Sequence, residues 1–294
     1  MAVDARRDRA FVKDGYELAR CPSCGLLARR ELPRSAELTS IYGDDYFRDD
    51  SADRSDGYAD YLGDEALHRD TARRRVALLQ RHGGTPGRLL DVGSACGFFV
   101  DEAAMHGWTA TGVDISPSMV SWGHSHLGVP LELGTVESVA IEPGTLDAVT
   151  MWDYLEHSLD PDAELRHCLR LLRPGGLLAL STGDVDSIAA RLSGRRWHLL
   201  TPRHHNYFFG RRTLLLLLQR VGFEVLAVRH PGARYSIRHL LYKLGRMART
   251  RAIAVPAERL GRSRLGALAL PVNLFDIVTV VARKPDETSL EAVA

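Results

Sequence analysis

The stretch LLDVGSACGFFV, residues 89–100, decides how the rest of the chain is interpreted. Its first part is short and apolar and ends at Asp91 and Val92, which is typical of a buried strand. Gly93, Ala95 and Gly97 follow at alternating positions, and a helical pattern begins after them. The stretch therefore predicts a strand, a tight loop and a helix, an arrangement that places a ligand on the loop.

Outward from this stretch, predicted strands alternate with predicted helices. Strands are expected at 88–93, 109–116, 131–135, 146–153, 177–182, 223–230 and 275–284, and helices at 65–83, 97–107, 116–128, 160–176 and 211–222. Such alternation predicts an α/β fold whose sheet is covered by helices on both faces. We expect a Rossmann-like, doubly wound, mostly parallel seven-stranded sheet.

Two domain-level units are predicted. Residues 1–62 are polar and are expected to form an irregular N-terminal segment, and residues 63–294 to form the α/β domain. Two stretches, about 184–210 and about 232–270, interrupt the alternation and are expected to be helical cap insertions. Both follow strands whose carboxyl ends should border a ligand crevice.

The sequence of the loop discriminates between three classes of ligand. A phosphate-binding Walker loop needs G-x-x-x-x-G-K-[ST], and no lysine lies near this loop. A dinucleotide fingerprint needs G-x-G-x-x-G, but after Gly93, Ala95 and Gly97 no further glycine follows at the required offset. The acidic Asp91 before the loop is also a poor neighbour for a pyrophosphate and a good one for a cation.

The pattern D-x-G-x-[GA]-x-G over residues 91–97 resembles the first motif of class I S-adenosylmethionine methyltransferases. GTLDAVTMWDYLEHSLDP (144–161) and LRLLRPGGLLALST (169–182) resemble the motifs around the fourth and fifth strands of that family. The resemblance implies that the cofactor is S-adenosylmethionine. The cofactor-binding residues it implies are Asp91, Gly93, Ala95, Gly97, Asp114, Ile115, Thr135, Val136, Glu137, Met151, Trp152 and Asp153.

Asp114 ends a predicted strand 23 residues after Asp91. A carboxylate at this place can accept hydrogen bonds from both ribose hydroxyls of the cofactor. Enzymes that use NAD have the same device, so Asp114 does not discriminate between the two cofactors. The alternative is that Asp114 only caps the following helix.

The segment RRWHLLTPRHHNYFFG (195–210) extends the resemblance to small-molecule methyltransferases of the ubiquinone-biosynthesis and sugar-modifying type, in which a histidine matches His204. A hydroxyl acceptor must lose a proton during attack, and a histidine can accept it. His205 and His157 are the further candidates, although His204 and His205 can equally be structural and His157 can order its loop. The expected acceptor contacts are Tyr46, Phe47, Trp197, Tyr207 and Phe208.

Cys21 and Cys24 form a C-x-x-C that looks like one half of a zinc ribbon. A structural zinc site needs four ligands, and neither Cys96 nor Cys168 is a credible second half. We therefore expect no metal and regard zinc as unlikely to be a cofactor. The alternative is a zinc site shared between the two subunits of a homodimer.

The net charge of +1 gives no reason to expect a nucleic-acid partner. Without a long apolar run or a leader-like segment, we expect a cytoplasmic protein with no stable membrane insertion. Residues 229–264 contain ten Arg or Lys against one acid, Glu258. This stretch is either a solvated helical cover or a surface for an anionic substrate, partner or membrane.

The expected function is methyl transfer to a small-molecule acceptor, first of all to an oxygen of a sugar, phenol or polyketide-like natural-product intermediate. N-, C- or carboxyl-methyl transfer is the alternative among enzymes, and a neutral amine acceptor would need no base. A dinucleotide-dependent oxidoreductase is disfavoured by the loop. A non-catalytic module that binds S-adenosylmethionine is the alternative outside enzymes.

Overall fold

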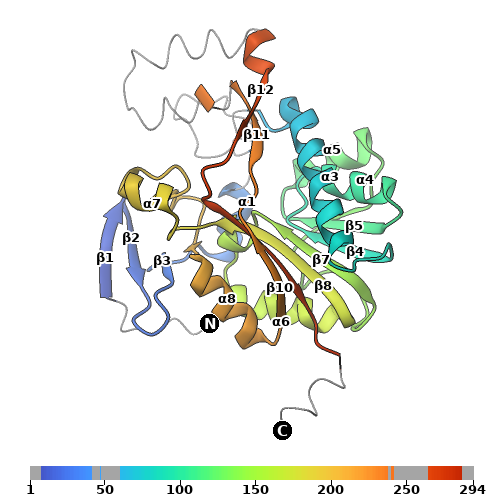
Figure 1. Ribbon diagram of the computed structural model, residues 1–294, viewed down its shortest axis with the longest axis horizontal. Helices are drawn as coiled ribbons and strands as arrows, with labels where there is room; N and C mark the ends of the chain where they lie inside the picture. The colour runs from blue at the N-terminus through green and yellow to red at the C-terminus, as the bar shows by residue number, and fades with distance from the viewer. Residues whose placement is uncertain (1–7, 42–46, 48–59, 238–239, 242–263, 287–294) are drawn as a thin grey trace.

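A seven-stranded sheet forms the centre of the protein in our computed structural model, which describes residues 8–41, 47, 60–237, 240–241 and 264–286 (Figure 1). The strand order is β10-β13-β8-β7-β4-β5-β6. The strands are β4 (Arg88–Val92), β5 (Thr109–Asp114), β6 (Leu131–Leu133), β7 (Leu146–Trp152), β8 (Leu172–Gly183), β10 (Glu224–Arg229) and β13 (Ile277–Arg283). Only β13 runs antiparallel to its neighbours in this sheet. The predicted mostly parallel, Rossmann-like sheet is confirmed.

Helices cover both faces of the sheet, so its central strands are apolar on both sides. On one face, α3 (Glu65–Arg81), α4 (Phe98–Met105) and α5 (Pro117–His126) pack residues such as Val76 and Val100 into one core. On the other face, α6 (Pro161–Leu171) and α8 (Arg211–Val221) contribute Leu165 and Leu214 to a second core. α6 begins where the sequence reads Asp-Pro, because the Asp160 carboxylate accepts hydrogen bonds from the amides of Asp162 and Ala163.

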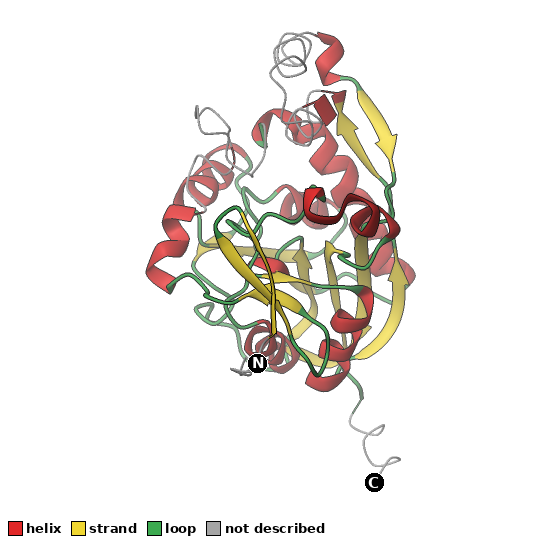
Figure 2. Ribbon diagram, turned by 90° about the vertical axis from the view of Figure 1, so that its left-hand side faces the viewer, coloured by secondary structure: helices red, strands yellow, loops and turns green. Residues whose placement is uncertain are grey.

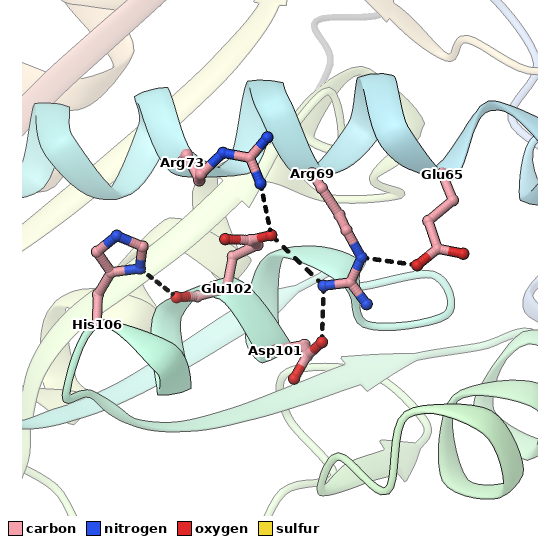
Figure 3. Close-up of polar contacts among 6 residues, drawn as sticks. All are labelled: Glu65, Arg69, Arg73, Asp101, Glu102 and His106. Carbon is pink, nitrogen blue, oxygen red and sulfur yellow. Dashed lines mark hydrogen bonds and ion pairs between the residues drawn. The ribbon is translucent and has the colours of Figure 1, made fainter.

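A charged network ties α3 to α4 beside the glycine-rich loop (Figure 3). The guanidinium of Arg69 bonds Glu65 and Asp101, each at 2.7 Å. Arg73 adds a contact to Glu102 at 3.0 Å, and the Glu102 carboxylate is buried. Paired and hydrogen-bonded charges of this kind fix the position of a helix pair, because removing one partner would leave the other charge buried and uncompensated.

The N-terminal segment differs from the expectation, because residues 8–29 are not irregular. They form the strands β1 (Asp8–Lys13), β2 (Tyr16–Arg20) and β3 (Leu27–Arg29). Asp14 and Gly15 make the two-residue turn between β1 and β2, both with positive φ (49° and 83°), as a type I′ hairpin requires. β9 (Tyr207–Phe208) pairs with β3, so part of the first predicted insertion completes a four-stranded sheet at the flank of the molecule (Figure 2).

In their described residues, the two predicted insertions are only partly helical. The first holds the short helix α7 (Ile188–Ser193) and the strand β9. The second begins and ends with an antiparallel pair, β11 (Ala233–Ser236) and β12 (Ala269–Val272), which stands above the sheet in Figure 1. Most of the basic stretch 229–264 lies outside the described residues. Among the described residues, no helix is both long and apolar enough to cross a membrane.

Candidate functional site

A cavity of about 1320 Å³ lies over the carboxyl ends of the parallel strands. Its lining includes the ends of β4, β5 and β7 and the residues that follow β6. It continues along α3, the corner between β10 and β11, and the start of β13. This is the place where open α/β sheets bind ligands.

The glycine-rich loop turns sharply at one wall of this cavity. Gly93 and Gly97 have φ of +72° and +89°, and Ala95 has +48°, a conformation that L residues seldom adopt. A Cβ on Gly93 would collide with the ring of Tyr154, and one on Gly97 would meet Val129 and Leu131. The glycines are therefore required by the path of the backbone and by the side chains packed against it. Gly93 and Ala95 line the cavity, whereas Gly97 begins α4 beneath it.

Asp114 lies at the tip of β5 and lines the same cavity. One carboxylate oxygen accepts a hydrogen bond from the amide of Ala95 at 2.8 Å, and the other from the amide of Ser116 at 2.9 Å. Burial raises the pKa of Asp114, although these amides favour the charged form. Each oxygen has a second lone pair, so the carboxylate that shapes the loop can also accept ribose hydroxyls.

Four of the twelve expected cofactor residues do not line the cavity. Asp91 is buried behind the loop, where one of its oxygens accepts a hydrogen bond from Thr150 Oγ1 at 2.6 Å. Burial raises its pKa to about 7. Val136 and Met151 are fully buried in the core on the α6 and α8 side, and Gly97 lies at the start of α4. The eight others line the cavity, namely Gly93, Ala95, Asp114, Ile115, Thr135, Glu137, Trp152 and Asp153.

Arg75 joins α3 to the end of β7 and was not predicted from the sequence. Its guanidinium bonds the Asp153 carboxylate at 2.7 Å and lies 4.6 Å from the centre of the Trp152 ring. Asp153 also accepts a hydrogen bond from Ser181 Oγ at 2.8 Å and has a positive φ of 54°. These contacts hold Asp153 in a strained backbone conformation at the edge of the cavity.

The three candidate histidines are placed differently. His157 and His205 line the cavity, with ring centres 4.7 Å apart, but His204 does not and is only 3% exposed. Burial lowers the pKa of His204 to about 3 and that of His157 to about 4. The structure therefore does not bring His204 to the cavity; its backbone continues into β9, which is tied to the N-terminal sheet.

Backbone carbonyls orient the two histidines that line the cavity. His157 Nδ1 lies 3.1 Å from the oxygen of His204, and His205 Nδ1 lies 3.0 Å from the oxygen of Leu199. A carbonyl oxygen can only accept, so in a neutral His205 ring Nδ1 carries the proton and Nε2 is the acceptor atom. An acceptor nitrogen is what a general base requires.

Glu156 completes a cluster with these two histidines. One potential ligand atom from each of Glu156, His157 and His205 lies within 4.8 Å of the others, so the group could hold a divalent cation. Burial, followed by the charge of Asp153, raises the pKa of Glu156 to about 8. A cation bound here would have to displace the proton that Glu156 carries at neutral pH.

Most of the expected acceptor contacts lie away from the cavity. Trp197 and Phe208 pack with Leu18 and Leu27 of the N-terminal sheet, and the Tyr207 ring lies in the main core. The pairing of β9 with β3 places Tyr207 and Phe208 there. Phe47 does line the cavity, although it packs beside Ala95 of the cofactor loop, and Tyr46 lies outside the described residues.

Asp276, just before β13, brings a further histidine to the cavity. His198 Nε2 lies 2.8 Å from Asp276 Oδ2, and the indole of Trp197 donates to the same oxygen at 2.9 Å. Tyr235 from β11 also lines the cavity, and burial raises its pKa to about 12. The sequence offers little signal for this group, because its members come from three segments far apart in the chain.

Cys21 and Cys24 lie on the turn between β2 and β3, away from the cavity. Cys21 Sγ lies 3.1 Å from Ser23 Oγ. Despite the opposing effect of burial, the hydrogen bonds around the thiol lower the pKa of Cys21 to about 7. Among the described residues, the remaining thiols, Cys96 and Cys168, are buried in separate parts of the core.

Comparisons with known proteins agree with this geometry. Residues 64–228, more than half of the chain, match the family described as a methyltransferase domain. The ubiquinone biosynthesis O-methyltransferase of Chromobacterium violaceum is 36% identical over 126 residues, which are 40% of this chain and 54% of the relative. That of Xanthomonas euvesicatoria pv. vesicatoria is 40% identical over 150 residues, 47% of this chain and 63% of the relative. The chain spans about half the length of the curated relatives it matches.

Solved structures share the fold at low sequence identity. A SAM-dependent methyltransferase from Archaeoglobus fulgidus superposes with a TM-score of 0.51 at 18% identity, covering 76% of this chain and 99% of that one. One from Thermotoga maritima has a TM-score of 0.50 at 17% identity, covering 76% and 92%. The sheet order, the loop with Asp114 and the family match agree with one another. The chain therefore belongs to the methyltransferase domain family, in its class I form with S-adenosylmethionine as the cofactor.

Proposed function

We propose that the protein transfers the methyl group of S-adenosylmethionine to an oxygen of a small-molecule acceptor, of the sugar, phenol or polyketide-like kind. The observation that carries the proposal is that Asp114 and the glycine-rich loop share one cavity with His157 and His205. Cofactor-binding and proton-accepting groups thus face the same space. The relatives named above are O-methyltransferases by name, which favours an oxygen acceptor over nitrogen or carbon.

In this proposal the loop and Asp114 would hold S-adenosylmethionine, which would supply an electrophilic methyl group. The cavity walls would position the acceptor and limit its contact with water, and such positioning supplies much of the rate. His205 Nε2 accepts the proton that the acceptor hydroxyl loses as its oxygen attacks. The hydrogen bond from Nδ1 to the Leu199 carbonyl keeps the ring in the required tautomer.

His205 replaces His204 as the first candidate for the base, because His205 lines the cavity. We expect His205→Ala to lower turnover by roughly 10²–10⁴ with nearly unchanged affinity for S-adenosylmethionine. His204→Ala, the adjacent control, should lower turnover less than tenfold in a folded protein. The assay is formation of S-adenosylhomocysteine with a panel of hydroxylated acceptors, together with titration of the cofactor.

Two outcomes would redirect this assignment. If a chelator abolishes turnover and a divalent cation restores it, His205 acts as a ligand in the cluster with Glu156 and His157 rather than as a base. If none of the His157, His204 and His205 variants loses tenfold, base catalysis by histidine is wrong. An amine or carboxylate acceptor would then be the better assignment, and S-adenosylmethionine binding without turnover on any acceptor would favour a non-catalytic module.

A further inference from the structure

The cavity extends well beyond the strand ends that bear the expected cofactor residues. At about 1320 Å³ it exceeds the roughly 300–1000 Å³ of common small-molecule sites. The additional lining comes from the outer part of α3 and from the corner between β10 and β11. An acceptor of substantial size therefore fits beside the cofactor.

Arginines line this extension, and several of them have no ion pair with any residue in the part of the chain that the structure describes. Arg74 and Arg75 are each paired with a carboxylate, Asp70 and Asp153 respectively. Arg81, Arg229 and Arg234 also line the cavity, and the described part of the chain provides no ion pair for them.

The carboxylates near the same corner already have partners. Asp276 accepts one hydrogen bond from the indole of Trp197 and lies beside His198, and Asp184 lies 3.3 Å from His230 Nε2. Asp64 accepts a hydrogen bond from Ser236 Oγ at 3.2 Å. Within the described ranges, the corner thus presents guanidinium groups that form no ion pair with an acid.

The chain continues from this corner into the most basic part of the sequence. Residues 229–264 carry ten Arg or Lys and a single acid. Arg229 and Arg234 are the first two of those ten, and both are exposed at the cavity. Leu240, further along the same stretch, also lines it.

We propose that the methyl acceptor carries an anionic group, a phosphate or a carboxylate, which binds Arg229 and Arg234 at the corner between β10 and β11. Planar guanidinium groups bind both kinds of anion through paired N–H donors. The unpaired arginines also attract an anion into the cavity before it docks. This inference rests on the proposed function, because it names the class of acceptor for the same cavity.

The test measures binding without turnover, so that it is separate from the test of methyl transfer. The 294-residue chain, saturated with S-adenosylhomocysteine, is titrated calorimetrically with two anions of similar length. Pyrophosphate represents phosphates and malonate represents carboxylates. We expect one of the two to bind the wild type, which identifies the anion class. The double variant Arg229→Gln/Arg234→Gln should bind that probe at least tenfold more weakly, with unchanged affinity for S-adenosylhomocysteine.

The matched control is Arg211→Gln/Arg212→Gln, which removes two exposed arginines at the start of α8 that do not line this cavity. It should bind the probe as the wild type does. The inference is overturned if neither probe binds the wild type, or if the control weakens binding as much as the corner variant. Failure of S-adenosylhomocysteine to bind the wild type would instead count against the proposed function.

Discussion

Asp114 is expected both to hold the glycine-rich loop in place and to bind the ribose of the cofactor, and the variant Asp114→Asn allows the two roles to be measured separately. In the folded protein its two oxygens accept from the amides of Ala95 and Ser116, and both residues are buried. An asparagine keeps one acceptor oxygen and places an NH₂ group against the other amide. One buried N–H then loses its acceptor, which costs about 1–3 kcal/mol of the free energy of unfolding. For a domain of this size the melting temperature should fall by roughly 2–12 °C.

The same substitution removes the charge that would accept the ribose hydroxyls. Loss of a hydrogen bond to a charged group costs about 1.5–3 kcal/mol, so affinity for S-adenosylmethionine should fall roughly tenfold to hundredfold. Calorimetric titration measures the loss of cofactor affinity, and a thermal melt measures the loss of stability. Asp70→Asn is the control, because it breaks only an exposed ion pair with Arg74 on α3 and should change stability by less than about 0.5 kcal/mol.

The two measurements give distinct refutations. A lower melting temperature with wild-type cofactor affinity would show that Asp114 only shapes the loop and the start of α5. An unchanged melting temperature would refute the argument that its two amide contacts are stabilising. Wild-type behaviour in both assays would remove Asp114 from the site.

Three further predictions follow from other parts of the structure. Gly97→Ala should lower the free energy of unfolding by about 2–4 kcal/mol in urea, because the site has a φ of +89° and the new Cβ would contact Val129 and Leu131. In the control Gly128→Ala, the φ is +66° and no atom lies near the new Cβ, so the loss should be only about 1 kcal/mol. Burial lowers the pKa of His68 to about 4 from an unfolded value near 6.5, so the unfolded chain binds more protons between these values. His68 should therefore contribute up to about 3 kcal/mol to the loss of stability as pH drops through this window, in addition to the contributions of His157 and His204. A His68→Gln variant that loses as much stability as the wild type would contradict this. Elemental analysis should find less than one zinc per chain, and the variant Cys21→Ser/Cys24→Ser should bind S-adenosylmethionine normally. One tightly held zinc per chain would instead indicate a metal site at the C-x-x-C, and half a zinc per chain in a dimer would indicate a site shared between subunits.

The α/β core was predictable from the sequence because its signals are local. The apolar runs that became β4, β7 and β13 and the helices between them were expected near their observed places. The N-terminal hairpin was missed even though Asp14 and Gly15, between short apolar stretches, are a strong hairpin signal. Its pairing with β9 has no local signal, because it joins residues about 180 positions apart, such as Leu27 and Phe208.

The same limit explains the candidate site. Asp114, Gly93 and Ala95 are close in sequence and all line the cavity, and their binding of the cofactor stays a prediction. His204 and His205 are adjacent, and only the packing of β9 determines which of them faces the cavity. Arg75 meets Asp153, and His198 meets Asp276, only in the folded chain, so no spacing in the sequence predicts these contacts.

The short pairing of β3 with β9 has a consequence for how this protein can diversify. Through it the hairpin at the amino end is joined to the segment that carries His205, and Asn206 extends the connection by bonding the Arg29 amide and the Glu156 carbonyl. The strand ends that bear Asp114 and Gly93 take no part in it. Substitutions in the hairpin can therefore reshape the side of the cavity that carries His205 over evolutionary time, while the side that bears Asp114 and Gly93 stays intact. Chimeras that exchange residues 8–31 between homologues are a direct way to redirect acceptor choice.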